Sequence, residues 1–470
     1  MKKKLKRKMN KYFKFELKER GMEIMVKDRF IIQNNNSMYN ILYLPDSFQI
    51  AKIKKGINIE EINISPRYLN EPAIKELQLG EGKVGITFMS ARTCNLKCRY
   101  CYAGEGEYGN VDNKPKTLSA DGYMQAVNMV LKEYPEGIKS ISFFGGEPLI
   151  NFKEISIFVP EVLKEFEKKR LENPKISMIT NLVLLTDEMA AFLNKYNIMI
   201  AISLDGGKDI NDLSRIGYTD ESVYDLVMKG VERLKKHRVK FVLQATINRN
   251  HLKCYITGSA IEWAKSIEAT GCSNFLAIPV ESDIKDLTVV KDLPILDKFI
   301  RELIGYYLKK LVSDEPGIIP TGMVAPIFQI VHKKTVHNCT SGHSLLIDTD
   351  GKAYPCQMFC NIDEACIGSV KDGLQGKLVK YYANISRFKG EKCQNCIARN
   401  ICVVWCKGIQ LLSHGDMYEV CQARCVYQKA IMEECIKFLA GLDKKSRKYA
   451  NLYNNYKKLS ERLMADGFVI

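Results

Sequence analysis

Strand-like and helix-like segments alternate along the middle of the chain. Short apolar runs typical of strands lie at 84–89, 138–144, 176–180, 198–204, 241–247 and 275–280. Amphipathic stretches follow them at 119–133, 152–172, 186–194, 222–236, 260–270 and 293–311. Six strands that are each followed by a helix predict an α/β fold with a parallel sheet, curved into a full or partial (β/α)6 barrel. In such folds the chemistry lies at the carboxyl ends of the strands.

The segments on either side of this alternation follow other patterns. Apolar runs at 30–32 and 39–44, joined by turn-forming residues at 34–37, predict a hairpin in a small N-terminal α+β module. After Pro320 the chain becomes short segments rich in cysteine, with Gly351, Gly368 and Gly373 as turn points. We therefore expect four parts: an N-terminal module (1–82), a barrel (83–320), a cysteine-rich domain (321–430) and a charged helical tail (431–470).

Composition and charge limit the classes of function. The chain has 470 residues, which is too many for one compact core. Its net charge is +16, but about half of that excess lies in residues 1–20, so the remainder does not indicate a nucleic-acid partner. No apolar run reaches the roughly 18 residues that span a bilayer, and the charged start does not resemble an export signal. We expect a cytoplasmic protein with no membrane and no nucleic-acid partner.

Cysteine is the most informative residue type in this sequence. The chain has 16 cysteines, and a reducing compartment disfavours structural disulfides and favours metal or redox chemistry. Three of them form the motif Cys94-x3-Cys98-x2-Cys101, directly after the first barrel strand. Three thiolates on one loop can hold three irons of a 4Fe–4S cube and leave the fourth iron open, as an active metal site requires. A zinc knuckle is the alternative, but no nearby fourth ligand completes it.

This motif resembles the signature of the radical S-adenosylmethionine (SAM) superfamily. The resemblance implies that SAM binds the open iron and yields a 5′-deoxyadenosyl radical that abstracts a substrate hydrogen. A Gly-Gly-Glu-Pro motif at the end of the second strand also resembles the family pattern. Glycines permit close backbone approach, and a carboxylate pairs with the SAM ammonium group. The resemblance implies SAM contacts from Tyr100, Gly146, Glu147, Ser203 and Arg215, whereas it assigns no catalytic side chain.

A second set of cysteines lies near the C-terminus. The run Cys393-x2-Cys396-x5-Cys402-x3-Cys406 is flanked by further cysteines, in loop-rich sequence with few apolar residues. This pattern suggests that metal clusters replace a hydrophobic core. The spacing resembles the SPASM domain, which carries two auxiliary clusters in radical SAM enzymes that modify peptides and proteins. The resemblance implies auxiliary cluster I on Cys339, Cys356 and Cys406, and auxiliary cluster II on Cys393, Cys396, Cys402 and Cys421. The implied cofactors are three 4Fe–4S clusters and SAM.

Several cysteines leave alternatives open. No cysteine lies between Cys339 and Cys356, so auxiliary cluster I is either completed by Cys360 or left with one iron open to the substrate. We expect the open iron. Zinc in part of this region is an alternative, and Cys366 and Cys425 have no assigned role. The three remaining cysteines, Cys254, Cys272 and Cys435, are expected to be buried apolar residues.

The resemblance implies a radical SAM oxidoreductase that matures a ribosomally made, cysteine-rich peptide, for example by forming a thioether cross-link. The N-terminal module then suits recognition of a leader peptide by strand addition. The expected partners are this precursor peptide and a small electron donor such as flavodoxin or ferredoxin. One alternative is anaerobic sulfatase maturation, in which the residue after the second SPASM cysteine is an Asp base; here it is Gln357, which cannot accept a proton at neutral pH. Another is a non-catalytic iron–sulfur protein that binds a peptide.

Overall fold

The computed structural model describes residues 29–34, 37–57, 81–104, 106–108, 114–282, 284–336, 339, 341–443 and 445–465. The basic segment at 1–20 and part of the predicted turn at 34–37 lie outside these residues. Among the described residues, no helix is long and apolar enough to cross a bilayer.

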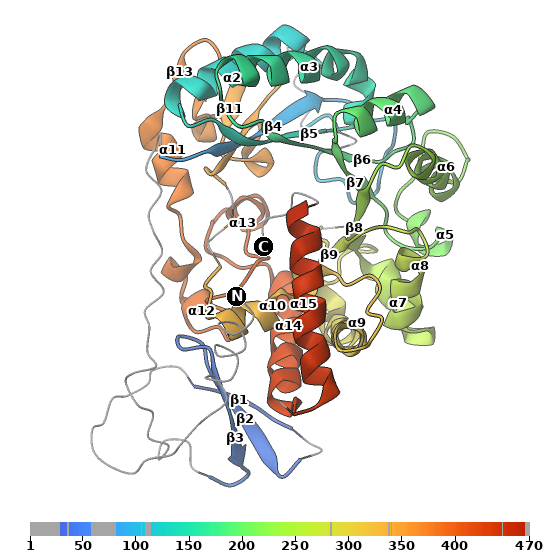
Figure 1. The fold of residues 1–470 in the computed structure, drawn as a ribbon, viewed down its shortest axis with the longest axis vertical. Coiled ribbons are helices and arrows are strands. Elements are labelled where there is room, and N and C mark those ends of the chain that lie inside the picture. Colours follow the sequence, from blue (N-terminus) through green and yellow to red (C-terminus); the bar gives the residue numbers. More distant parts are fainter. Residues whose placement is uncertain are drawn as a thin grey trace.

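The centre of the fold is a ten-stranded sheet with the strand order β13-β12-β11-β10-β4-β5-β6-β7-β8-β9. The six strands from β4 to β9 are parallel and lie in sequence order, which confirms the predicted parallel sheet. The sheet bends into an arch with helices along its outer side (Figure 1). The bounds of these six strands are Val84–Ala91, Ile138–Gly145, Lys175–Thr180, Met199–Ser203, Phe241–Ile247 and Phe275–Pro279.

Several of the helices between these strands begin at residues whose side chains cap them. Ser119, Thr186 and Ser222 each accept a hydrogen bond from a backbone N–H of the first turn that follows. Residues 169–172 were predicted to be helical, but α3 ends at Lys168 because Arg170 takes a left-handed conformation (φ 56°). The helix α7 was not predicted. The barrel helices are α2 (Ala120–Glu133), α3 (Phe152–Lys168), α4 (Asp187–Lys195), α5 (Lys208–Asn211), α6 (Val223–Lys236), α7 (Arg249–Thr257), α8 (Ala260–Glu268) and α9 (Leu293–Leu311).

Aromatic side chains fill the core between the first strands and their helices. Phe88 of β4 lies edge-on to Tyr123 of α2 and to Phe158 of α3, at centroid distances of 4.8 and 5.7 Å. Phe143 of β5 completes the group, and all four rings are fully buried. Such edge-to-face packing adds to the free energy gained by apolar burial. The first β/α units are therefore held by an apolar core that needs no cofactor.

The cysteine-rich region extends the barrel sheet. Its first strand, β10 (Ser344–Ile347), pairs in parallel with β4, and three short antiparallel strands follow: β11 (Lys352–Tyr354), β12 (Gly368–Ser369) and β13 (Gly373–Leu374). The predicted turn points Gly351, Gly368 and Gly373 all have positive φ. At Gly368 a Cβ would lie 2.2 Å from the carbonyl oxygen of Gly373, so only glycine fits there.

Helices form the rest of the C-terminal half. The long helix α14 passes through residue 431, where a boundary between domain and tail was predicted. Its neighbours include α9, α10 and the N-terminal sheet. The helices are α10 (Thr321–His332), α11 (Gly376–Ala383), α12 (Glu391–Gln394), α13 (Lys407–His414), α14 (Gln422–Gly441) and α15 (Arg447–Ala465).

A separate antiparallel sheet lies beside the lower end of α14 (Figure 1). Strands β1 (Phe30–Ile32) and β2 (Tyr39–Leu44) form the predicted hairpin, whereas the third strand, β3 (Gln49–Lys54), was not predicted. The turn between β2 and β3 contacts the cysteine-rich region. There Asp46 forms an ion pair with Arg399, and the Asn400 amide donates to the Pro45 carbonyl at 3.0 Å.

Candidate active site

A cavity of about 370 Å³ lies at the carboxyl ends of the parallel strands, where the fold class predicts the chemistry. We call it the barrel cavity. Residues of the cysteine-rich half, such as Met358, Ile409 and Leu412, line it together with the barrel residues. All eight residues predicted to bind the first cluster or SAM also line it: Cys94, Cys98, Tyr100, Cys101, Gly146, Glu147, Ser203 and Arg215.

The loop with the first three cysteines is fixed by backbone hydrogen bonds. Cys101 N–H donates to the Cys98 carbonyl at 3.0 Å and closes a turn within the motif. The N–H groups of Lys97 and Arg99 donate to carbonyls of residues 216 and 214, on either side of Arg215. The three thiols and the Arg215 guanidinium are thus held on the same side of the cavity. Burial raises the pKa of Cys98 to about 11, so a bound metal would have to displace its proton.

The two glycines of the Gly-Gly-Glu-Pro motif are required by close contacts: Gly145 packs against Ala91 at the end of β4, and Gly146 packs against the segment that leads into Cys94. A Cβ on Gly146 would lie 2.1 Å from the Thr93 carbonyl oxygen. Gly146 N–H donates to the Ala91 carbonyl at 2.8 Å, and Glu147 N–H donates to the Thr93 carbonyl at 3.0 Å. The motif therefore positions the segment just before Cys94.

The Glu147 carboxylate is buried beneath the cavity. It accepts hydrogen bonds from the Thr180 hydroxyl at 2.6 Å, from Asn181 N–H at 2.7 Å and from Leu149 N–H at 3.0 Å. Burial outweighs these bonds and raises its pKa to about 7. The same Asn181 donates through its side chain to the side-chain oxygen (Oδ1) of Asn95 at 2.8 Å, so it links Glu147 to the cysteine loop.

Asp205 anchors the side of the cavity that carries the cysteine loop and Arg215, although the sequence pointed only to its neighbour Ser203. Its carboxylate forms an ion pair with Arg215 at 3.1 Å and accepts a hydrogen bond from the Tyr100 hydroxyl. Its backbone carbonyl accepts hydrogen bonds from His251 Nε2 and Trp263 Nε1, both at 2.8 Å. Asp205 thus fixes Arg215 and Tyr100, while the buried Nε of Arg215 has no partner among the described residues.

The thiols of the cysteine-rich half form two sets. In the first set, the Cys339 and Cys406 thiols form a hydrogen bond that lowers the pKa of Cys406 to about 6, and Cys356 is close to both. The fully buried Lys407 ammonium lies near all three thiols, and its charge favours their thiolate forms. Lys407 was not anticipated from the sequence.

The second set lines another cavity, of about 450 Å³. Cys393, Cys396 and Cys402 lie near the buried Arg387 guanidinium, a cation that the sequence did not reveal. The resemblance to the SPASM domain implies Cys421 as the fourth ligand of this set. Both Cys421 and Cys425 line this cavity, one helical turn apart at the start of α14. Cys425 interacts with all three thiols, whereas the neighbours of Cys421 are Glu281, Arg424, Cys406 and Cys425.

Comparison with protein families gives a match over the region of the first site. A profile described as the radical SAM superfamily matches residues 89–251, which include the cysteine loop, the Gly-Gly-Glu-Pro motif and Arg215. This chain contains a radical SAM domain.

Relatives of known activity also contain such a domain. The chain is 24% identical over 387 residues to "Radical SAM cyclopropyl synthase TigE" of Paramaledivibacter caminithermalis, covering 77% of this chain and 76% of that protein. It is 25% identical over 338 residues to a "Cysteine-type anaerobic sulfatase-maturating enzyme" of Clostridium perfringens, covering 67% and 86%. These relatives are enzymes, as this chain is.

Solved structures show the same fold. The native anSMEcpe structure with bound AdoMet matches with a TM-score of 0.61 and 18% identity, over 80% of this chain and 99% of that one. Streptococcus suis SuiB bound to S-adenosylmethionine matches with a TM-score of 0.50 and 16% identity, over 73% and 77%. At these identities the likeness concerns the fold alone.

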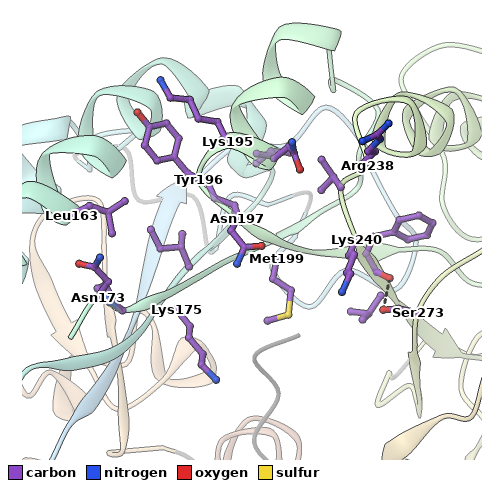
Figure 2. Close-up of a pocket in the computed structure, with 18 residues that line it drawn as sticks. Leu163, Asn173, Lys175, Lys195, Tyr196, Asn197, Met199, Arg238, Lys240 and Ser273 are labelled. Atoms are coloured by element: carbon purple, nitrogen blue, oxygen red, sulfur yellow. Dashed lines mark hydrogen bonds between the residues drawn. The ribbon is translucent and has the colours of Figure 1, made fainter. Parts of the chain in front are cut away.

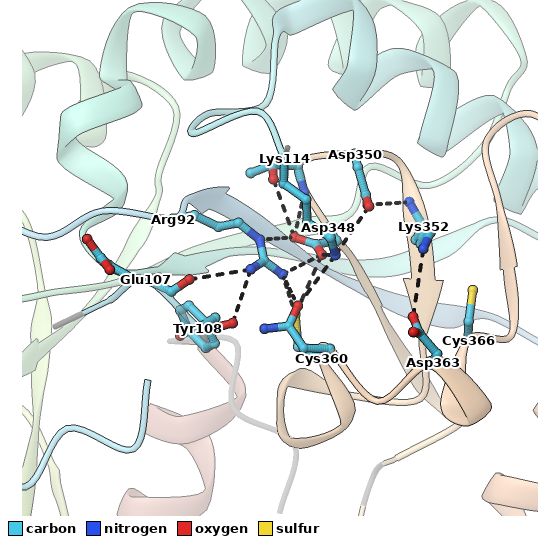
Figure 3. A network of polar contacts seen from close by, with 12 residues as sticks. Arg92, Glu107, Tyr108, Lys114, Asp348, Asp350, Lys352, Cys360, Asp363 and Cys366 are labelled. Atoms are coloured by element: carbon cyan, nitrogen blue, oxygen red, sulfur yellow. Dashed lines mark hydrogen bonds and ion pairs between the residues drawn. The ribbon is translucent and has the colours of Figure 1, made fainter. Parts of the chain in front are cut away.

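A buried polar network joins the radical SAM domain to the cysteine-rich half (Figure 3). Arg92, two residues before Cys94, forms a bidentate pair with Asp348 at 2.8 and 2.6 Å. Its Nη2 also donates to the Cys360 sulfur at 3.0 Å, and Lys114 forms an ion pair with Asp348 at 2.7 Å. Cys360 therefore lies in this network, and its neighbouring charges are Asp348, Arg92 and Lys114.

The remaining cysteines have separate surroundings. The Cys366 thiol donates to the Gly368 carbonyl. Cys272 and Cys435 are buried, as expected, whereas Cys254 is only partly buried on α7, so the expectation for it was wrong. Among the described residues, no three His, Cys, Asp or Glu side chains converge as ligands of a single metal ion.

A further cavity, of about 530 Å³, lies at the opposite, amino ends of strands β6 to β8 (Figure 2). Its lining includes Lys175, Lys195, Arg238 and Lys240 but none of the predicted site residues. Lys195 and Arg238 point to one side of the sheet and Lys175 and Lys240 to the other, so these cations do not form one binding site.

Proposed function

We propose that this protein is a radical SAM enzyme that modifies a peptide. The observation that carries the proposal is the barrel cavity, where three thiols and the candidate SAM contacts face a wall from the cysteine-rich half. A reduced 4Fe–4S cluster with bound SAM supplies a 5′-deoxyadenosyl radical, which takes a hydrogen atom from the substrate. The sulfatase-maturating relatives and the anSMEcpe structures with bound peptides support a peptide substrate.

The residues of the cavity have distinct roles in this proposal. Cys94, Cys98 and Cys101 hold the first cluster, because three thiols without a fourth are the donor set for a cluster with one open iron. Gly146 and Glu147 accept the SAM ammonium group, Ser203 binds its ribose and Arg215 its carboxylate, with Tyr100 beside the adenine. Asp205 keeps Arg215 and Tyr100 in place through the contacts described above.

We further propose that two auxiliary clusters occupy the two thiol sets, which makes three clusters in all. Cys339, Cys356 and Cys406 hold the first, beside the buried Lys407. Cys393, Cys396 and Cys402 hold the second with Cys425 in place of Cys421, because Cys425 is the thiol that interacts with all three. The hydrogen bond from Arg92 to Cys360 supports an iron left open at auxiliary cluster I over ligation by Cys360.

The N-terminal sheet is the proposed site for a leader peptide. Strands β1 and β3 are its edges, and an edge strand offers backbone N–H and C=O groups to an added strand. A flavodoxin or ferredoxin is the proposed source of the electron. The bond formed in the peptide, a thioether or another C–H modification, rests on the resemblance stated above.

The experiment that tests the proposal is SAM cleavage. Reduced, reconstituted protein should convert SAM to 5′-deoxyadenosine, and Cys98→Ala should abolish this while the iron of the auxiliary sets remains bound. Cys254→Ala, on the outer helix α7, is the matched control. A Cys98→Ala protein that forms deoxyadenosine at the wild-type rate would refute the assignment of the cavity.

Anaerobic sulfatase maturation is the second candidate, favoured by the sulfatase-maturating relatives. The two reactions differ in their products. A thioether forms with loss of two hydrogens and retention of sulfur, whereas oxidation of a cysteine to formylglycine removes its sulfur. Mass spectrometry of a cysteine-rich peptide and of a sulfatase-derived peptide, each incubated with the enzyme and SAM, distinguishes them.

A further inference from the structure

One polar pair on the wall of the barrel cavity has no part in the roles above. Glu281 follows strand β9 by two residues, and Arg424 lies in the first turn of α14. Both line the barrel cavity, although their side chains are only 11% and 15% exposed. They come from the two halves of the molecule and meet at the cavity.

Their facing atoms lack hydrogen bonds. Arg424 Nε lies 3.9 Å from Glu281 Oε1, which is too far for a hydrogen bond between them. Both atoms are buried, and neither has a partner among the described residues. Buried polar atoms without a partner are rare in native proteins and call for an explanation such as a ligand or water.

Helix stability does not explain Arg424. The amino end of a helix carries a partial positive charge, so a cation in the first turn is unfavourable. Its guanidinium donates a long hydrogen bond, from Nη1 to the Val404 carbonyl at 3.4 Å. The guanidinium faces Glu281 and the cavity on one side, and its charge also favours the thiolate forms of the nearby Cys406 and Cys421.

The rest of this wall is apolar. Met358, Ile409 and Leu412 line the same cavity, and Leu412 is half-exposed at 52%. A substrate side chain that enters from this direction therefore contacts apolar side chains and one polar pair, Glu281 and Arg424. This arrangement suits a short side chain that ends in a single polar atom.

The geometry points to Glu281 and Arg424 as the pair that holds the hydroxyl or thiol of the substrate residue beside SAM. One oxygen or sulfur atom can donate its hydrogen to Glu281 Oε1 and accept from Arg424 Nε, because a gap of 3.9 Å places it within reach of both. The side chain of Cys, Ser or Thr meets this requirement and that of Ala does not. The inference rests on the proposed function, since it assigns the residue type of the peptide substrate.

The test uses full-length, reconstituted protein with SAM bound and three capped amino acids as probes: N-acetylcysteine amide, N-acetylserine amide and N-acetylalanine amide. Saturation-transfer NMR measures their dissociation constants. We expect the thiol and hydroxyl probes to bind about fivefold more tightly than the methyl probe, the size of one net hydrogen bond. Glu281→Ala should remove this preference, whereas Glu172→Ala, at a carboxylate whose side chain is 79% exposed, should keep it.

Two outcomes would overturn the inference. One is equal binding of all three probes to the wild-type protein, which would mean that the gap holds a water molecule only. The other is equal weakening of all three by Glu281→Ala. If that variant does not fold, Arg424→Lys provides the same test, because it keeps the charge but moves the donor. If the wild-type protein formed no deoxyadenosine from SAM, the proposed function would be refuted instead. The preference among the probes is measured by binding and does not depend on SAM cleavage.

Discussion

The barrel and the cysteine-rich half are built on different physical principles. Between the first strands and their helices, the core of the barrel consists of fully buried aromatic side chains such as Phe88, Phe143 and Phe158. In the cysteine-rich half, the buried Arg387 and Lys407 lie beside thiols. Apolar burial stabilises the barrel core without any ligand, whereas buried cations next to thiols need negative charge, which the thiolates of the proposed auxiliary clusters would supply. We therefore expect the barrel to depend on its own core and the cysteine-rich half to depend in addition on the proposed clusters.

The largest expected effect comes from removing iron. Chelation should leave hydrogen exchange in strands β4 to β8 nearly unchanged. It should increase hydrogen exchange by several orders of magnitude at residues 393–406, because the cluster proposed there would contribute directly to folding. Hydrogen-exchange mass spectrometry with and without chelator makes this comparison, and equal protection of both regions in the metal-free protein would contradict it.

Phe158→Ala tests the other side of the comparison. It removes a fully buried ring of the aromatic group and should destabilise the protein by about 3–5 kcal/mol. The decrease in the free energy of unfolding, measured by denaturant unfolding, should be the same with and without iron. The matched control is Phe438→Ala, which removes a partly buried ring on α14. It should lower the free energy of unfolding by a smaller amount.

Glu147 adds a pH dependence to the barrel. Its pKa is about 7 in the folded protein against an ordinary 4.5, so its contribution to stability is full below pH 4.5 and is lost as the pH rises to 7. The difference in free energy of unfolding between wild type and Glu147→Gln should therefore change by about 3 kcal/mol over this range. Urea unfolding of the metal-free proteins at several pH values measures it. A constant difference would show that the hydrogen bonds to Glu147 offset its burial.

Arg92→Met weakens the connection between the halves. The change breaks the bidentate pair with Asp348, although Lys114 remains as a partner of that carboxylate. We expect the free energy of unfolding to fall by about 2 kcal/mol, which is less than the loss for a buried charge left without any partner. Faster hydrogen exchange at β10 and β11 would locate the effect. Arg99→Met, which loses one exposed 3.4 Å hydrogen bond, should change neither quantity.

The smallest effect is expected at the N-terminal sheet. Asp46→Asn replaces the ion pair with Arg399 by a neutral contact, and the Asp46 side chain is 36% exposed. Solvent screening limits the loss to about 1 kcal/mol. Exchange should rise in β2 and β3 and stay unchanged in the barrel. A similar rise in the barrel would mean that the sheet stabilises the whole molecule.

Local patterns predicted the barrel well because they depend on neighbours in the sequence. The helix at 293–311 has the predicted bounds, and the six parallel strands have the predicted order. The Cys94 motif and the Gly-Gly-Glu-Pro motif were recognisable for the same reason. The pattern failed for the short helix α7 and for strand β3, where alternation of apolar and polar residues is weak.

Contacts between distant segments were decided by the tertiary structure. The sequence by itself determined which cysteines are candidates for ligands, but spacing could not separate Cys421 from Cys425, which lie one turn apart on the same helix. The sequence also did not show that β10 pairs with β4. Nor did it show that Asp205, Arg387 and Lys407 lie beside the candidate site residues. Glu281 and Arg424 are separated by more than a hundred residues and face each other only because β9 and α14 pack together. Such pairs depend on how whole elements pack, and periodicity within one element carries no information about that.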